Sequence, residues 1–118
     1  MHLLRLFRHP DALVDLEPDE LERQIQEAAP VVLVDVRTPR EYESGHIAGA
    51  VSVPWGREAT LVERWPVQTP LVLVCKTGHR SQAAAWTAFE LGYRQVAHLQ
   101  GGMDQWKRRG KPVEGPTP

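Results

Sequence analysis

One stretch of the sequence decides the fold: Leu71-Val-Leu-Val-Cys75-Lys-Thr-Gly-His-Arg80-Ser-Gln-Ala-Ala-Ala85. The four apolar residues before Cys75 predict a buried strand, and the glycine-containing segment 75–80 predicts a turn. Ser81 is expected to be the N-cap of the alanine-rich helix that follows. Backbone N–H groups of such a loop can converge on one point, and the positive end of the helix dipole points the same way. The stretch therefore predicts an anion-binding cup.

Cys75 is the only cysteine of the chain and opens this loop. A thiolate is the attacking species of cysteine chemistry, and cationic neighbours and helix N-termini favour it. Lys76, His79 and Arg80 all lie within the loop. A lone cysteine after an apolar strand can also be a small buried hydrophobic residue, but such a residue has no use for a glycine and two permanent cations directly after it. We therefore expect Cys75 to be catalytic.

The composition indicates one domain without an overall charge bias. The chain has 118 residues, of which 42% are hydrophobic, and its formal net charge is −1. This size suffices for one domain with a proper core. The charge provides no field that would attract nucleic acid or a membrane surface, so we expect neither as a partner.

Compartment and topology follow from the same composition. A single cysteine cannot form an internal disulfide, so the fold needs no oxidising compartment. Two arginines and two histidines interrupt the apolar residues of Met1–Pro10, which is not the pattern of a signal peptide. No apolar run approaches the roughly 20 residues of a membrane-spanning helix. We expect a soluble cytoplasmic protein.

Strand and helix patterns alternate along the chain. The expected strands are 12–16, 31–35, 51–53, 71–74 and 96–99, and the expected helices are 18–28, 39–44, 58–64, 81–91 and 103–109. This order predicts an α/β fold with a mainly parallel sheet of about five strands and helices on both faces. Residues 1–11 form an N-terminal arm without an assigned role, residues 12–110 form the domain, and residues 111–118 are expected to be a frayed tail.

Asp35 and Arg37 directly follow the apolar strand 31–35. Groups just past the carboxyl ends of parallel strands line the ligand crevice, so both should lie near Cys75. They can act on a ligand directly or form an ion pair that braces the loop, and both readings stay open. His46, in a glycine-flanked turn, is expected to be a hydrogen-bonding brace. No metal site is expected at Cys75, because His79 is the only other ligand nearby.

Four motifs occur in one order: Asp35-Val-Arg37, Glu41-Tyr-Glu-Ser-Gly-His-Ile-Ala-Gly-Ala-Val-Ser-Val-Pro54, Cys75-Lys-Thr-Gly-His-Arg80-Ser81 and Gly101-Gly-Met-Asp-Gln-Trp106. In these motifs the chain, from about Leu16 to Gly110, resembles the rhodanese family of sulfurtransferases in its small single-domain form. One departure is Ser52, where the family more often has Asn or His at a structural position.

The resemblance implies that Cys75 cycles through a persulfide, with thiosulfate or a related persulfidic compound as sulfur donor and a thiol or cyanide as acceptor. Thioredoxin or another protein thiol is a possible partner, and no cofactor is implied. The substrate-binding residues that we predict are Lys76, Thr77, Gly78, His79, Arg80, Ser81, Asp35 and Arg37. Among them, backbone N–H groups of the loop would stabilise the persulfide, and Lys76 and Arg80 would hold the oxygens of thiosulfate.

Two other functions stay open. Related cysteine-dependent phosphatases use a longer Cys-to-Arg loop that fits a tetrahedral phosphate, whereas only four residues separate Cys75 from Arg80 here. Family members that act on mercaptopyruvate tend to have a small uncharged loop, so the cations favour an anionic donor. Rhodanese-like domains also serve as sulfur-relay or regulatory binding modules, and the absence of a second thiol fits a relay as well as it fits turnover.

Overall fold

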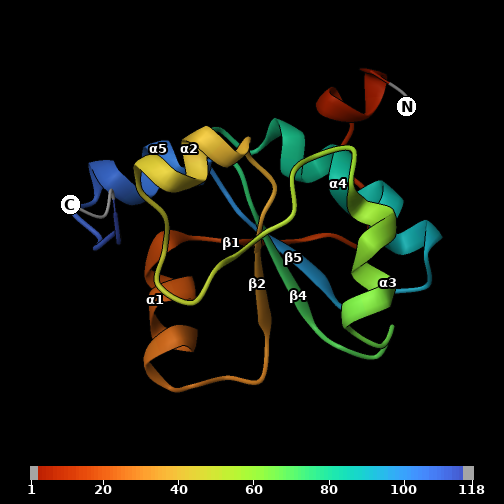
Figure 1. The fold of residues 1–118 in the computed structure, drawn as a ribbon, viewed down its shortest axis with the longest axis horizontal. Coiled ribbons are helices and arrows are strands. Elements are labelled where there is room, and N and C mark those ends of the chain that lie inside the picture. Colours follow the sequence, from red (N-terminus) through yellow and green to blue (C-terminus); the bar gives the residue numbers. More distant parts are fainter. Residues whose placement is uncertain (1–2, 116–118) are drawn as a thin grey trace.

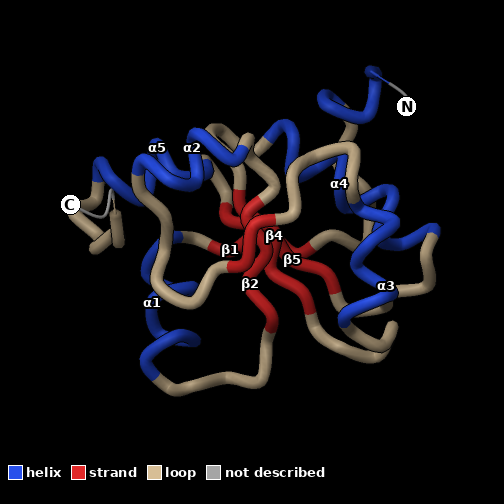
Figure 2. The backbone as a smooth tube through the Cα atoms, in the orientation of Figure 1, coloured by secondary structure: helices blue, strands red, loops and turns tan. Residues whose placement is uncertain are grey.

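The computed structural model describes residues 3–115, and its centre is a five-stranded parallel sheet in the order β1-β5-β4-β2-β3. Figures 1 and 2 show the strands in the middle of the molecule with helices on both sides. The strands are β1 (Val14–Leu16), β2 (Val32–Asp35), β3 (Val51–Ser52), β4 (Leu71–Val74) and β5 (Val96–Leu99). The prediction of an α/β fold with a mainly parallel sheet is confirmed.

Within residues 3–115, five α-helices and two 3-10 helices surround the sheet. Their bounds are η1 (Leu3–Phe7), α1 (Pro18–Gln26), α2 (Pro39–Ser44), η2 (Glu58–Thr60), α3 (Leu61–Arg64), α4 (His79–Glu90) and α5 (Gly102–Arg108). In Figure 1, α1, α2 and α5 lie on the left of the strands, and α3 and α4 lie on the right. No helix among residues 3–115 is long and apolar enough to span a membrane.

The central strand β4 separates two apolar clusters. Leu71 and Leu73 belong to a cluster that includes the alanines of α4, whereas Val72 and Val74 belong to a cluster with residues of α1 and α5. Successive strand residues point to opposite faces, and β4 is covered on both, which explains its continuous apolar sequence. Trp106 of α5 is 1% exposed and fills part of the second cluster. The loop after β4 therefore begins at the end of a strand that is packed on both faces.

The start of α4 differs from the sequence prediction. The helix begins at His79 with Gly78 as its N-cap, so the expected N-cap at Ser81 is wrong. Gly78 has φ +106, a left-handed conformation that glycine adopts without strain, and its carbonyl accepts the N–H of Gln82 at 3.2 Å. Ser81 lies inside the first turn, where its hydroxyl donates to the Gly78 carbonyl at 3.0 Å. The earlier start brings the helix N-terminus closer to Cys75.

The C-terminal segment is anchored rather than frayed as far as Glu114. The backbones of His46 and Glu114 form an antiparallel bridge, with N–O distances of 2.9 and 2.7 Å. The indole N–H of Trp106 donates to the Pro112 carbonyl at 2.8 Å. The prediction of a frayed tail is therefore wrong for 111–114, while 116–118 lie outside the described residues.

His46 has the bracing role that its sequence context predicts. Its Nδ1 lies 2.8 Å from the carbonyl oxygen of Tyr42, and the two rings stack with centroids 3.8 Å apart. The Tyr42 hydroxyl donates to the carbonyl of Ala50 at 2.7 Å. These contacts hold the turn between α2 and β3.

The described part of the N-terminal arm lies on α4 and contains η1. Arg5 makes a bidentate contact with Glu90, with both N–O distances at 2.8 Å. The side chains of Gln82 and Trp86 donate to backbone carbonyls of the arm, each at 2.9 Å. The sequence assigned no contact to this arm, because its anchoring residues are spread over one face of a helix far along the chain.

Candidate active site

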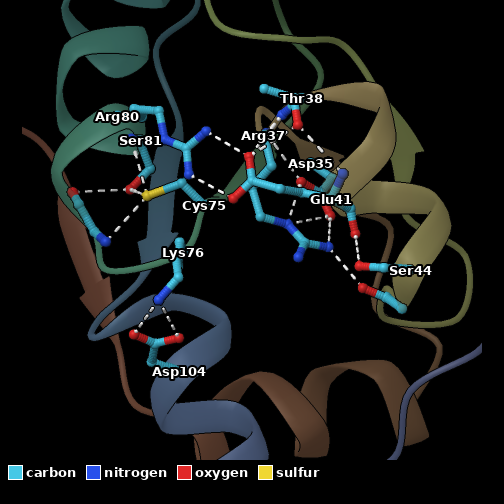
Figure 3. A network of polar contacts seen from close by, with 12 residues as sticks. Asp35, Arg37, Thr38, Glu41, Ser44, Cys75, Lys76, Arg80, Ser81 and Asp104 are labelled. Carbon is cyan, nitrogen blue, oxygen red and sulfur yellow. Dashed lines mark hydrogen bonds and ion pairs between the residues drawn. The ribbon is translucent and has the colours of Figure 1, made fainter.

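Cys75 directly follows the central strand β4, and its sulfur is enclosed by the loop and the start of α4 (Figure 3). The residue is 1% exposed. The backbone N–H groups of Gly78 and Ser81 donate to Sγ at 3.0 and 3.3 Å, and the Ser81 hydroxyl oxygen lies 3.4 Å from Sγ. Converging N–H groups at a helix N-terminus favour negative charge on the atom they face. The predicted anion cup is therefore present and centred on the sulfur.

Backbone N–H groups of helix α5 bind the backbone carbonyls of this loop. The N–H groups of Met103 and Asp104 donate to the carbonyls of Cys75 and Lys76 at 2.8 and 3.0 Å. Gly102 permits this approach, because a Cβ at that position would lie 2.4 Å from the Lys76 carbonyl oxygen and its φ is +60. The first turn of α5 thus binds the carbonyls of the loop, while loop N–H groups face the sulfur.

Both permanent cations of the loop have a carboxylate partner. Arg80 contacts Glu41 with two hydrogen bonds of 2.7 and 3.0 Å, and Lys76 contacts Asp104 at 3.0 and 3.1 Å (Figure 3). The hydrogen bond from Arg80 is the largest of the effects that lower the pKa of Glu41 from 4.5 to about 2. The same contact raises the pKa of Arg80. The sequence indicates these cations but not their partners, which are distant in the chain.

Asp35 and Arg37 form a buried ion pair at the end of β2. They are 0% and 3% exposed, and the shortest contact joins Arg37 Nη2 to Asp35 Oδ2 at 2.7 Å. Arg37 Nη2 also donates to the Gly45 carbonyl at 2.8 Å. The register pairs Asp35 with Val74, next to Cys75, so both residues lie at the carboxyl edge where the sequence places them. Contact with a substrate stays a prediction, and the observed contacts are those of a brace.

Besides Lys76, the exposed side chains of the loop are Thr77 and His79. Thr77 Oγ1 lies 3.1 Å from His79 Nδ1, and the His79 ring lies beside Phe7 of the arm, with centroids 5.5 Å apart. Because both side chains are exposed, a molecule that approaches the loop from solvent can reach them.

His98 is a residue of the site that the sequence analysis missed. It is 4% exposed, and its Nδ1 lies 2.7 Å from the hydroxyl oxygen of Ser81, which in turn contacts Cys75. Its Nε2 lies 2.7 Å from Oδ1 of Asp15 on the neighbouring strand β1. Burial lowers the pKa of His98, an effect that the hydrogen bond to Asp15 opposes. The signal was its place near the carboxyl end of an expected strand, the same signal that identified Asp35.

Comparison with known proteins places this geometry in context. The family model of the rhodanese-like domain matches residues 17–109. A sulfurtransferase of Allochromatium vinosum is 30% identical over 102 residues, which cover 86% of this chain and 95% of that protein. The thiosulfate sulfurtransferase GlpE of Pseudomonas aeruginosa is 32% identical over 97 residues, which cover 82% of this chain and 86% of that protein.

A solved structure gives the same fold over nearly the whole chain. It belongs to a protein of unknown function from Rhodopseudomonas palustris, described as a possible tyrosine phosphatase. Its TM-score is 0.84 at 30% sequence identity, and the match covers 97% of this chain and 95% of that one.

Proposed function

Because this chain belongs to the rhodanese-like domain family, whose relatives include named sulfurtransferases, we propose that Cys75 carries a sulfane sulfur from thiosulfate to a thiophilic acceptor. The observation that carries the proposal is the pair of N–H groups, from Gly78 and Ser81, that donate to Sγ at the end of the central strand. An enclosed sulfur with such donors is suited to alternate between a thiolate and an anionic persulfide.

The reaction has two displacements that share one intermediate. The Cys75 thiolate attacks the outer sulfur of thiosulfate, a new S–S bond forms, and sulfite leaves with the electron pair of the old S–S bond. The acceptor thiolate or cyanide then attacks the outer sulfur of the Cys75 persulfide and releases the Cys75 thiolate. Neither step needs an oxidant or a reductant, because the transferred atom is a sulfane sulfur in thiosulfate, in the Cys75 persulfide and in the product. The loop N–H groups stabilise negative charge in both states.

The loop side chains bind the donor in this proposal. Arg80 and Lys76 attract the oxygens of thiosulfate, and their carboxylate partners Glu41 and Asp104 hold each cation in place when no donor is bound. Thr77 and His79 are exposed and supply further hydrogen-bond donors. Asp35 and Arg37 support the site through the loop after β2, because their burial leaves them no surface for a donor.

A relay role is the nearest alternative within the family. Cys75 is the only cysteine, so this chain cannot resolve its own persulfide and must pass the sulfur to another molecule. In a relay that acceptor is a protein thiol, such as thioredoxin, and in turnover it is a small thiol or cyanide. Comparing the discharge rates of the persulfide by thioredoxin, glutathione and cyanide distinguishes the two roles.

A cysteine-dependent phosphatase is the second alternative, and the description of the Rhodopseudomonas palustris protein is the reason to test it. Four residues separate Cys75 from Arg80, which favours sulfur transfer over the longer phosphate-binding loop. Release of the phenol from an aryl phosphate by the wild type, and not by Cys75→Ser, would favour the phosphatase.

Intact mass spectrometry tests the proposed intermediate directly. The wild-type chain should gain one sulfur atom after incubation with thiosulfate, and cyanide should remove it as thiocyanate. Cys75→Ser is the matched control, because the change is nearly isosteric and should leave the fold intact. If neither thiosulfate nor another sulfane donor produces the adduct on the wild type, the persulfide mechanism is wrong.

A further inference from the structure

Three potential metal ligands from three separate segments meet beside the cup. Oδ1 of Asp15 on β1 lies 2.7 Å from Nε2 of His98 on β5 and 2.7 Å from Nε2 of His9 in the arm. The three ligand atoms all lie within 4.8 Å of one another. We propose that His9, Asp15 and His98 bind a divalent transition-metal ion of the zinc type. This site goes beyond sulfur transfer and does not depend on it.

The donor set suits such an ion. Two neutral imidazole nitrogens and one carboxylate are ligands that zinc takes in sites that keep a position open for water. With metal–ligand distances of about 2.0–2.2 Å, ligand atoms around one tetrahedral ion lie about 3.4 Å apart. The two 2.7 Å contacts would open slightly, and the distance between the histidine nitrogens, at most 4.8 Å, would shorten. Small side-chain rotations achieve both changes.

Two of the ligands lie on rigid, adjacent strands. The parallel register of β1 and β5 pairs Asp15 with His98, so the two side chains leave the same face of the sheet next to each other. The other ring nitrogen of His98 is held by Ser81 Oγ at 2.7 Å, which fixes the ring with Nε2 toward Asp15. A hydrogen bond on the second nitrogen of a histidine is the usual support for a ligand in a metal site.

The third ligand is brought in by the docked arm. The carbonyl of Arg8, the residue before His9, accepts the indole N–H of Trp86 at 2.9 Å, and the Pro10 carbonyl accepts the N–H of Leu13 at 3.1 Å. His9 is therefore held on both sides in sequence. An ion bound here would join the arm to the sheet.

Space and access are present for the ion and a bound water. A cavity of about 160 Å³ is lined by all three ligands and by Thr77 and Gly78 of the loop that follows Cys75. The side chains of His9 and Asp15 are each 38% exposed, whereas His98 is 5% exposed. The ion can enter from solvent on one side, and its position lies next to the loop that holds Cys75. The positive charge would add to the attraction of the cup for an anion.

The test is metal binding by the full-length chain in a Cys75→Ser background, which removes the thiolate as a competing zinc ligand. Isothermal titration with ZnCl₂ should give one ion per chain, and Co²⁺ should produce visible absorption bands of a low-symmetry N/O site. His9→Ala and Asp15→Asn should each weaken the affinity at least about tenfold. His98 is buried, so its variants are avoided because they can fail to fold.

His46→Gln is the matched control, since it removes a histidine that lies outside the cluster. Its affinity should equal that of the parent, which separates the proposed site from nonspecific histidine binding. Hydrogen exchange gives a second readout: Zn²⁺ should slow amide exchange in the arm of the parent and not of His9→Ala. Absence of one-to-one binding, or equal affinities for the parent, His9→Ala and Asp15→Asn, would overturn the proposal.

Discussion

Replacing Asp35 with alanine tests how the carboxyl edge of the sheet is held. In the folded chain, the guanidinium of Arg37 is buried and bonds Asp35 through Nε and Nη2, at distances between 2.7 and 3.2 Å. After the substitution, only the Gly45 carbonyl, at 2.8 Å, would remain as its partner. Leaving one charge of a buried pair uncompensated costs about 3–5 kcal/mol. Against a total stability of about 5–15 kcal/mol for a small domain, this loss is large.

Urea unfolding followed by far-UV circular dichroism measures the loss. With a slope of about 1–2 kcal/mol per molar urea, the midpoint of Asp35→Ala should fall by at least about 1.5 M. Asp104→Ala is the matched control, because it removes a carboxylate from an exposed pair with Lys76 and should cost less than about 1 kcal/mol. The double variant Asp35→Leu/Arg37→Met should be more stable than Asp35→Ala, because no buried charge is left unpaired.

The outcome also separates the two roles that the sequence left open for Asp35 and Arg37. If the pair is a brace, the double variant should retain sulfur loading from thiosulfate per folded chain. An Asp35→Ala midpoint close to that of the wild type would refute the argument that this buried pair holds the edge. A stable double variant that no longer accepts sulfur would instead indicate direct action on the donor.

Four further perturbations test other contacts. Arg80→Ala should raise the KM for thiosulfate more than it lowers kcat, and an unchanged KM in steady-state assays would exclude the proposed contact with the donor. Because the pKa of Glu41 is about 2 in the folded chain against an ordinary 4.5, its pair stabilises the fold above pH 4.5 and loses this effect as the pH falls toward 2. Glu41→Gln should therefore cost about 1 kcal/mol at pH 7, discounted for its partial exposure, and urea midpoints of variant and wild type should converge by pH 2. Trp106→Ala should cost about 3–5 kcal/mol because its ring is buried. Trp86 of α4 is only partly buried and contacts the arm, so Trp86→Ala should cost less, and equal melting temperatures of the two variants would contradict the packing. Gly102→Ala should lower the free energy of unfolding by more than about 2 kcal/mol, because the φ of this residue is +60 and the new Cβ would meet the Lys76 carbonyl. It should also slow the loading of sulfur, measured by mass spectrometry. A wild-type loading rate would show that the loop tolerates the displacement.

Local patterns were sufficient to predict the sheet and the sulfur-bearing loop. The strand before Cys75 is a continuous apolar run, and the glycine after it marks the turn, so neither required knowledge of distant residues. The start of the following helix was misplaced because Ser81 is a strong N-cap residue by type, whereas the left-handed backbone at Gly78 allowed the helix to begin earlier. A preference for capping residues does not reveal which peptide adopts a positive φ.

The partners of the cations could not be found in the same way. Glu41 is 39 residues from Arg80, and Asp104 is 28 residues from Lys76. A charged residue of the loop has many possible partners in the sequence, and only the packing of α2 and α5 against the sheet selects one. The sequence therefore predicts that the loop carries positive charges, but it does not predict which carboxylates pair with Lys76 and Arg80.

More of the contacts among the polar residues on the α4 side of the sheet can be predicted from the sequence. Side chains alternate between faces, so His98 shares a face with Val96, which packs in the cluster with α4. By the same alternation, Asp15 shares that face with Leu13, another member of the cluster. A buried histidine on this face needs partners, and the N-terminus of α4 and the neighbouring strand are the elements within reach. Alternation thus implies the contact between His98 and Asp15, whereas the arrival of His9 depends on the docking of the arm.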